Sequence, residues 1–138
     1  DAVIGNSRAV VRELLAEGVP QAKVRLIYNG IDVLQPLPDR NEARRALGLD
    51  DNTLVGVVVA NLIHYKGHRE LIRGAAHAVG RIRQPLRILL AGRDQGLELE
   101  LQALAKEEGV GDMIQFLGQR SDVAPLFAAA DSVPRLQM

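Results

Sequence analysis

The sequence has 138 residues, 47% of them hydrophobic, which is enough apolar material for the core of one ordinary domain and argues against disorder. Its 17 Lys and Arg residues balance its 17 Asp and Glu residues, which disfavours nucleic-acid binding and purely electrostatic attachment to a membrane. The absence of cysteine excludes disulfides, a thiol catalyst and cysteine-ligated metal, and we expect a cytoplasmic protein. No apolar run reaches the roughly 18 residues of a transmembrane helix, and the first residues do not resemble a signal peptide.

The first 30 residues predict a strand, a helix and a second strand. The stretch from Ala2 to Gly5 is short and apolar, and Asn6 or Ser7 offers a side-chain oxygen to cap the following helix. That helix has an apolar face with a spacing of four residues and ends at Gly18. Val24 to Tyr28 reads as the second strand.

From residue 54 onward, strands and helices alternate. Before that point, two prolines indicate a loop from Asp32 to Asp39, and Asp39 and Glu42 have capping-box spacing ahead of a short helix ending at Gly48. The later strands are predicted at Leu54 to Ala60, Leu86 to Ala91 and Met113 to Leu117, and the later helices from Gly67 to Val79, Leu97 to Glu108 and Val123 to Ala130. Alternation with short connections predicts right-handed crossovers and an α/β fold with an open parallel sheet flanked by helices.

An open parallel sheet binds ligands beyond the carboxyl ends of its strands, so the loops after the three later strands are the candidate sites. The first of these loops contains Asn61, Lys66 and Gly67. A lysine beside a helix N-terminus, with a glycine that lets the backbone approach an anion, favours a phosphate or diphosphate. On spacing alone, a solvated lysine followed by a simple turn is the better interpretation.

The other two loops combine glycine with arginine. Their candidate binding residues are Gly92 and Arg93 in the second loop and Gly118, Gln119 and Arg120 in the third. Glycine lets the backbone pass under a ligand, and arginine binds phosphates or bases. The alternative for each loop is a capped helix start, with Asp94 as the cap in the second loop and Ser121 or Asp122 in the third. For the second loop, as a bare pattern, this alternative is favoured.

The three histidines, His64, His68 and His77, do not predict a metal site. His64 and His68 are four residues apart, but His64 precedes the predicted helix and no carboxylate stands at ligand spacing with them. A role at the surface, or behind the residues that contact a ligand, is the better interpretation, and we expect neither a metal nor a cofactor. The sequence also lacks G-x-S-x-G, Walker A and G-x-G-x-x-G patterns, which disfavours hydrolase, P-loop and dinucleotide-binding interpretations.

Six fragments of the sequence occur together in a recognisable order. They are Gly5-Asn6-Ser7-Arg8-Ala9-Val10, Ile27-Tyr28-Asn29-Gly30-Ile31-Asp32, Val59-Ala60-Asn61-Leu62 with Tyr65-Lys66-Gly67-His68, Leu89-Leu90-Ala91-Gly92, Ile114-Gln115-Phe116-Leu117-Gly118 and Ala128-Ala129-Ala130-Asp131. Together they resemble the family 4 retaining glycosyltransferases, which have the two-domain GT-B fold. The resemblance covers nearly the whole chain and implies that residues 1–138 are one partial, Rossmann-like domain, the C-terminal nucleotide-sugar-binding domain, without the N-terminal acceptor domain.

The resemblance implies that the ligand is a nucleotide sugar, commonly linked to UDP, GDP or ADP. Lys66 matches the family lysine that contacts the donor diphosphate, and Asn61 and Gly67 are assigned to the same diphosphate site. The residues assigned to the nucleotide are Gly92, Arg93, Gly118, Gln119 and Arg120. The segment from Asn29 to Asp32 matches the one that follows the crossover between the two domains.

One departure from the family concerns the charge at the diphosphate site. Many members carry an arginine at the position of Asn61 or of Ile63, where it shares the diphosphate charge with the lysine. Neither residue is charged here. Diphosphate binding should therefore be weaker, or should depend on Arg93 or Arg120.

A second departure lies near the end of the sequence. After the position of Asp131, family members continue into a Pro-Ser segment and an E-x7-E motif, whose carboxylates and adjacent amides engage the donor sugar. This sequence has Pro134-Arg135 and ends soon afterwards, so we expect a truncated fragment. Without an acceptor domain and this motif, a hexosyltransferase fragment should bind a donor without catalysing transfer.

The leading hypothesis is therefore the donor-binding part of a glycosyltransferase that transfers a sugar, with retention, to a glycan, lipid or small-molecule acceptor. The alternative is a non-catalytic Rossmann-like module from a truncated gene, with a structural or nucleotide-sensing role, which Asn61 and the atypical tail slightly favour. We also expect a homodimer, because an incomplete sheet exposes an unpaired edge and an apolar face. The sequence does not specify the sugar, the nucleotide or the acceptor.

Overall fold

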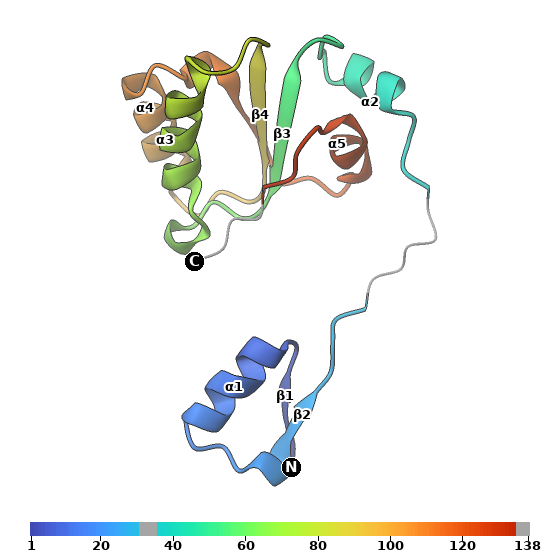
Figure 1. Ribbon diagram of the computed structural model, residues 1–138, viewed down its shortest axis with the longest axis vertical. Helices are drawn as coiled ribbons and strands as arrows, with labels where there is room; N and C mark the ends of the chain where they lie inside the picture. Colours follow the sequence, from blue (N-terminus) through green and yellow to red (C-terminus); the bar gives the residue numbers. More distant parts are fainter. Residues whose placement is uncertain (31–35, 135–138) are drawn as a thin grey trace. The chain divides into compact units, whose positions relative to one another are not determined.

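The computed structural model describes residues 1–30 and 36–134 and divides the chain into two compact units (Figure 1). The N-terminal unit comprises residues 1–36 and the C-terminal unit residues 37–138. The predicted loop that begins at Asp32 lies partly outside the described residues, as do Ile31 and the segment from residue 135 onward. The prediction that residues 1–138 form one domain stays a prediction.

The N-terminal unit is a strand, a helix and a second strand, as the sequence predicts. Its elements are β1 (Val3–Gly5), α1 (Arg8–Ala16), a 3-10 turn (Gln21–Lys23) and β2 (Val24–Leu26), with β1 and β2 parallel. The Ser7 hydroxyl accepts a hydrogen bond from the Val10 amide at 3.2 Å, which confirms the predicted cap of α1. The second strand was predicted to reach Tyr28, which is two residues too long. Its pairing with β1 ends where the Ile27 amide donates to the carbonyl of Gly5 at 3.0 Å, because β1 itself stops there.

The C-terminal unit contains the alternating strands and helices. Its elements are α2 (Arg40–Ala46), β3 (Leu54–Val59), a 3-10 turn (His64–Lys66), α3 (His68–Val79), β4 (Leu86–Ala91), α4 (Glu98–Glu107), a 3-10 turn (Gly111–Met113), β5 (Ile114–Gly118) and α5 (Ala124–Ala129). The Asp39 carboxylate accepts hydrogen bonds from the amides of Asn41 and Glu42 and caps α2, as predicted. The α/β architecture is confirmed, whereas the short 3-10 turns were not predicted.

The order of strands reverses beside β3. Strands β3, β4 and β5 lie side by side and parallel in that order. The chain then returns through α5 to the other side of β3, where the Val57 amide donates to the Ser132 carbonyl at 3.0 Å and Gly56 pairs with Ser132 in parallel. The crevice at such a reversal is the usual ligand site of open α/β sheets.

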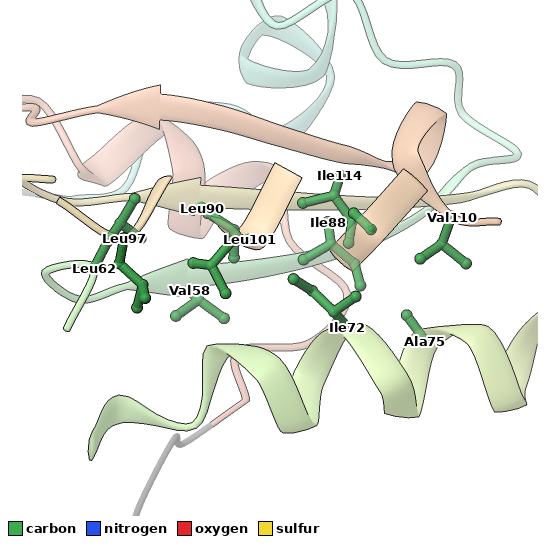
Figure 2. Packing of buried hydrophobic residues seen from close by; sticks show 11 residues of the cluster. Val58, Leu62, Ile72, Ala75, Ile88, Leu90, Leu97, Leu101, Val110 and Ile114 are labelled. Carbon is green, nitrogen blue, oxygen red and sulfur yellow. The ribbon is translucent and has the colours of Figure 1, made fainter. Parts of the chain in front are cut away.

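Helices cover both faces of this sheet and enclose an aliphatic core (Figure 1). On one face, α3 and α4 pack against the strands, and Figure 2 shows Ile72 and Ala75 of α3 directed toward Val58 and Ile88. On the other face, α2 and α5 pack around the fully buried Leu126. The buried hydrophobic residues of this core are Leu, Val, Ile and Ala.

A buried arginine joins α2 to the rest of the C-terminal unit. The side chain of Arg44 is enclosed, with the residue only 1% exposed. Its guanidinium donates to the carbonyls of Ala129 at 3.0 Å, Asp50 at 2.7 Å and Thr53. One residue of α2 thereby holds the end of α5 and the turn before β3.

The carboxylate of Asp131 extends this network to the returning segment. It accepts hydrogen bonds from Arg44 at 3.3 Å, from Arg40 at 2.5 Å and from the Val55 amide at 2.8 Å. Burial raises the pKa of Asp131, but the Val55 amide and the two guanidinium groups together outweigh it and hold the pKa below the ordinary value. The charged form is therefore the one that the fold stabilises.

We expect Asp131→Asn to lower the free energy of unfolding by about 1–3 kcal/mol at neutral pH, because charge-assisted hydrogen bonds are lost. Since the folded-state pKa of Asp131 is depressed, its contribution is present above the unfolded-state value near pH 4 and is lost as the pH falls through the folded-state value. Urea unfolding of both proteins at pH 7 and pH 3 measures this, and the difference between them should shrink at pH 3. Asp51→Asn, in an exposed turn, is the control. Equal stability of Asp131→Asn and wild type at pH 7 would contradict the assignment.

Candidate functional site

The loops after β3, β4 and β5 leave the same edge of the sheet and contact one another. The amide of Gly92 donates to the carbonyl of Gly118 at 2.8 Å, and the amide of Leu62 donates to the carbonyl of Arg93 at 2.9 Å. The structure thus brings together the three loops in which the sequence predicts binding residues.

Gly92 is the point of closest approach between the ends of β3 and β4. A Cβ atom on this residue would lie 2.0 Å from the carbonyl oxygen of Ala60 and 2.9 Å from the amide nitrogen of Asn61. No larger residue fits there without a shift of the backbone. The sequence suggests a glycine that passes under a ligand, and the structure shows that it is required first by the packing of the two strands.

A cavity of about 260 Å³ opens between these loops. It is lined by Val59, Ala60, Asn61, Ala91, Gly92, Arg93, Gln119, Arg120 and Val123. Most of the predicted binding residues therefore share this cavity, which we call the nucleotide-side cavity. Gly118 lies at the end of β5 with a φ of +65°, a conformation that favours glycine.

Polar side chains from the three loops form a chain of hydrogen bonds along the nucleotide-side cavity. The side-chain oxygen of Asn61 accepts a hydrogen bond from the amide of Arg93 at 3.2 Å. The Nε of Arg93 in turn donates to the side-chain oxygen of Gln119 at 3.0 Å. Within the described residues, no carboxylate forms an ion pair with Arg93, so its charge is available to an anionic ligand.

Arg120 also lines the cavity, but a carboxylate already binds it. Its guanidinium donates to both oxygens of Asp122, at 2.9 and 2.5 Å, and this hydrogen bonding raises the pKa of Arg120 and lowers that of Asp122. The prediction that Ser121 or Asp122 caps the next helix is wrong. α5 begins without a side-chain cap, and Pro125 in its first turn has no amide hydrogen to satisfy.

The start of α4 is capped by Asp94, as predicted. One oxygen of this carboxylate accepts hydrogen bonds from the amides of Gly96, Leu97 and Glu98, at 2.9, 2.8 and 3.0 Å. The bonds from Leu97 and Glu98 contribute most to lowering the pKa of Asp94. The amides at the start of α4 are therefore occupied by the protein itself.

Lys66 lines a second hollow beside the nucleotide-side cavity. This hollow has a volume of about 230 Å³ and lies where the strand order reverses, between the end of β3 and the returning segment. Its lining residues are Val58, Val59, Ala60, Lys66, Phe127, Val133 and Pro134, and we call it the lysine-side hollow. Val59 and Ala60 belong to both spaces, so Lys66 lies at the same sheet edge as the predicted nucleotide residues without lining their cavity.

The start of α3 adjoins Lys66 and has no side-chain cap within the described residues. Gly67 separates the 3-10 turn that carries Lys66 from α3, with a φ of +71° that only glycine adopts at low cost. The predicted start of the helix near Gly67 is confirmed. The first amides of α3 lack the carboxylate that α4 has.

The three histidines occupy different environments. Nδ1 of His77 lies 2.8 Å from the carbonyl of Arg73, and Nδ1 of His64 lies 3.1 Å from the guanidinium of Arg69. His68 is buried, and its Nε2 lies 3.0 Å from the carbonyl oxygen of Asn61. Over residues 1–30 and 36–134, no group of three or more His, Asp or Glu side chains is arranged to hold a metal ion.

Residues 39–133, more than half of the chain, match the sequence model of a family described as glycosyl transferases group 1. The chain belongs to this family. The match lies within the C-terminal unit, which contains both the nucleotide-side cavity and the lysine-side hollow.

Relatives of the chain include named glycosyltransferases. A D-inositol 3-phosphate glycosyltransferase of Actinosynnema mirum is 34% identical in an alignment of 122 positions that covers 81% of this chain and 29% of that protein. A lipopolysaccharide core biosynthesis mannosyltransferase, LpsB, of Rhizobium meliloti is 31% identical in an alignment of 137 positions that covers 95% of this chain and 37% of that protein. The chain thus spans about a third of the length of the curated relatives that it matches.

Solved structures share the fold. Alr3699/HepE of Anabaena, in complex with UDP-glucose, has a TM-score of 0.82 and 28% identity, and the match covers 96% of this chain and 37% of that one. The lipopolysaccharide-biosynthesis glycosyltransferase WaaG has a TM-score of 0.81 at 22% identity, over 94% of this chain and 36% of that one. The parallel sheet flanked by helices is that of the Rossmann-like domains of GT-B glycosyltransferases.

None of the helices described here has both the length and the apolar character needed to cross a bilayer.

We expect Gly92→Ala to lower the free energy of unfolding by about 1–3 kcal/mol, because the added methyl group overlaps the Ala60 carbonyl and forces the ends of β3 and β4 apart. Thermal or urea unfolding measures this change. Gly74→Ala is a matched control, since a Cβ there meets nothing within 4 Å and alanine favours the interior of α3. Gly74→Ala should be at least as stable as the wild type, and a Gly92→Ala variant that is equally stable would show that the close approach at Gly92 does not constrain the fold.

Proposed function

We propose that the C-terminal unit binds the nucleotide diphosphate of a nucleotide sugar, and that the whole protein transfers this sugar, with retention, to a glycan, lipid or small-molecule acceptor. The observation that carries the proposal is the juxtaposition of Lys66, the uncapped start of α3 and the nucleotide-side cavity at one edge of the sheet. All three lie at or beside the reversal of strand order. Ligands of open α/β sheets bind at that place.

Two cations and one helix start supply the attraction for a diphosphate. In the described part of the chain, neither Lys66 nor Arg93 forms an ion pair with a carboxylate, whereas Arg120 is paired with Asp122. The start of α4 is occupied by Asp94, but the start of α3 has no side-chain cap. The positive end of the α3 dipole and its amides thus favour an anion beside Lys66.

The nucleotide-side cavity suits the nucleoside end of such a ligand. Val59 is 42% exposed at the end of β3 and offers an apolar surface to a ring, and it also borders the lysine-side hollow. Asn61, Gln119 and Arg120 supply polar groups around the same cavity. A ligand that spans Val59 would place its base against these polar groups and its phosphates toward Lys66 and Gly67.

Arg93 takes the place of the second cation in this proposal. The sequence lacks an arginine at Asn61, and the Asn61 side chain binds the Arg93 amide instead. Gln119 orients the guanidinium of Arg93 from the other side. Arg93 and Lys66 therefore share the phosphate charge from the second and first loops.

Donor binding without transfer is the activity proposed for residues 1–138 alone. Transfer requires a donor and an acceptor held face to face with water excluded, and the residues assigned here contact the donor only. The absence of a required metal, the cytoplasmic location and the homodimer stay predictions. The alternative of a non-catalytic module is not favoured, because the family and the relatives of the chain are glycosyltransferases.

We expect the chain to bind UDP, the nucleotide found with the similar Anabaena protein, and Lys66→Ala to weaken binding about tenfold by removing a charged phosphate contact. Arg93→Ala should weaken binding by a comparable factor. Isothermal titration calorimetry measures both, with UDP-glucose and GDP-mannose as further ligands. Lys106→Ala is the control, because Lys106 lies in the last turn of α4 and lines neither the nucleotide-side cavity nor the lysine-side hollow.

The contribution of the Lys66 charge to UDP binding is tested separately by changing the ionic strength. Raising the ionic strength should weaken binding to the wild type more than to Lys66→Ala, because screening acts on the contact that the variant lacks. Failure of the wild type to bind any of these nucleotides at millimolar concentration would contradict the proposed function. Equal affinity of wild type and Lys66→Ala would contradict the diphosphate site.

A further inference from the structure

We infer that His68 is a positioning residue for the nucleotide-side cavity, which acts through Asn61 on Arg93. The inference concerns the orientation of groups in the free protein and rests on the proposed function only for its effect on ligand affinity. Three observations carry it: the burial of His68, the direction of its hydrogen bond, and the chain of contacts that begins at Asn61.

The ring of His68 is enclosed at the start of α3, with the residue 1% exposed. Its Nε2 lies 3.0 Å from the carbonyl oxygen of Asn61, and since a carbonyl only accepts, Nε2 carries the hydrogen and donates it. Nδ1 is buried and has no hydrogen-bond partner in the part of the chain that the structure describes. Nε2 is therefore the ring nitrogen through which His68 acts on its surroundings.

The hydrogen bond from His68 supports a sharp bend in the first loop. The carbonyl of Asn61 also accepts a hydrogen bond from the amide of Ile63 at 3.0 Å, across a turn of three residues. The next residue, Leu62, is fixed by its bond to the Arg93 carbonyl at 2.9 Å. The carbonyl of Asn61 is therefore held toward α3, which directs the Asn61 side chain toward the amide of Arg93.

The effect of His68 extends across all three loops. Asn61 binds the amide of Arg93, and the Nε of Arg93 binds Gln119, so one buried ring supports a side chain from each loop. His68 itself is absent from the lining of the nucleotide-side cavity. The side chain of His68 therefore acts on a ligand through Asn61 and Arg93, whereas its main-chain amide belongs to the start of α3 beside Lys66 and is kept when the side chain is substituted.

The test uses the 138-residue chain and three substitutions. His68→Leu removes the donor and keeps apolar bulk, and His68→Gln places an amide donor near the position of Nε2. Ile72→Val is the control, because it trims the same helix at a fully buried position in the core. Hydrogen exchange of the Arg93 amide, measured by NMR without ligand, should be about fivefold to tenfold faster in His68→Leu, as expected for the loss of one hydrogen bond. It should be restored in His68→Gln and unchanged in Ile72→Val.

Ligand affinity supplies the second readout. His68→Leu should weaken UDP binding by about fivefold, and the loss should vanish in an Arg93→Ala background but persist in a Lys66→Ala background. Failure of the wild type to bind UDP would overturn the proposed function, and the exchange of the Arg93 amide would still decide this inference. Unchanged hydrogen exchange of the Arg93 amide in His68→Leu would overturn the inference itself.

A second pair of variants decides if His68→Leu does not fold. His68→Gln is then compared with His68→Asn, since asparagine places its donor near the position of Nδ1. Equal protection of Arg93 in those two variants would overturn the role of Nε2.

Discussion

The C-terminal unit depends on the buried guanidinium of Arg44. Removing a cation from water is costly unless its hydrogens find acceptors, and here three carbonyls and the carboxylate of Asp131 accept them, although Nε has no partner among the described residues. These acceptors come from the turn before β3 and from the end of α5, so the network fixes the returning segment beside β3. Without the returning segment the strand order would not reverse beside β3. The lysine-side hollow would also lose Val133 and Pro134 from its lining.

The parts of the fold that follow from nearby residues could be predicted from the sequence. The caps at Ser7, Asp39 and Asp94 join atoms within four residues of one another, and the strand and helix periods are equally local. The contact between Arg44 and Asp131 joins residues 87 positions apart, and nothing in a single sequence marks an arginine of an amphipathic helix as buried. The length of β2 was overestimated for a related reason, because β2 ends where its partner β1 ends, and the sequence of β2 does not contain that information.

The place of the candidate site was predictable, and its internal arrangement was not. Parallel strands bring their following loops to one edge, which is why Asn61, Arg93 and Gln119 share a cavity. The sequence does not show that Lys66 enters a neighbouring hollow, because a 3-10 turn sets its direction. The sequence left two interpretations open for His68, a place at the surface or one behind the residues that contact a ligand, and its position at a helix start does not show that the residue is buried.

The contact between Gly92 and the Ala60 carbonyl has a consequence for how this site diversifies. Because only a hydrogen atom fits at position 92, main-chain atoms alone set the spacing of the two strand ends. Substitutions of the side chains at neighbouring loop positions, such as Asn61, change the lining of the nucleotide-side cavity and leave that spacing intact. The side chains that line the cavity and the spacing of the strands that carry them can therefore change independently, because Gly92 alone fixes the spacing.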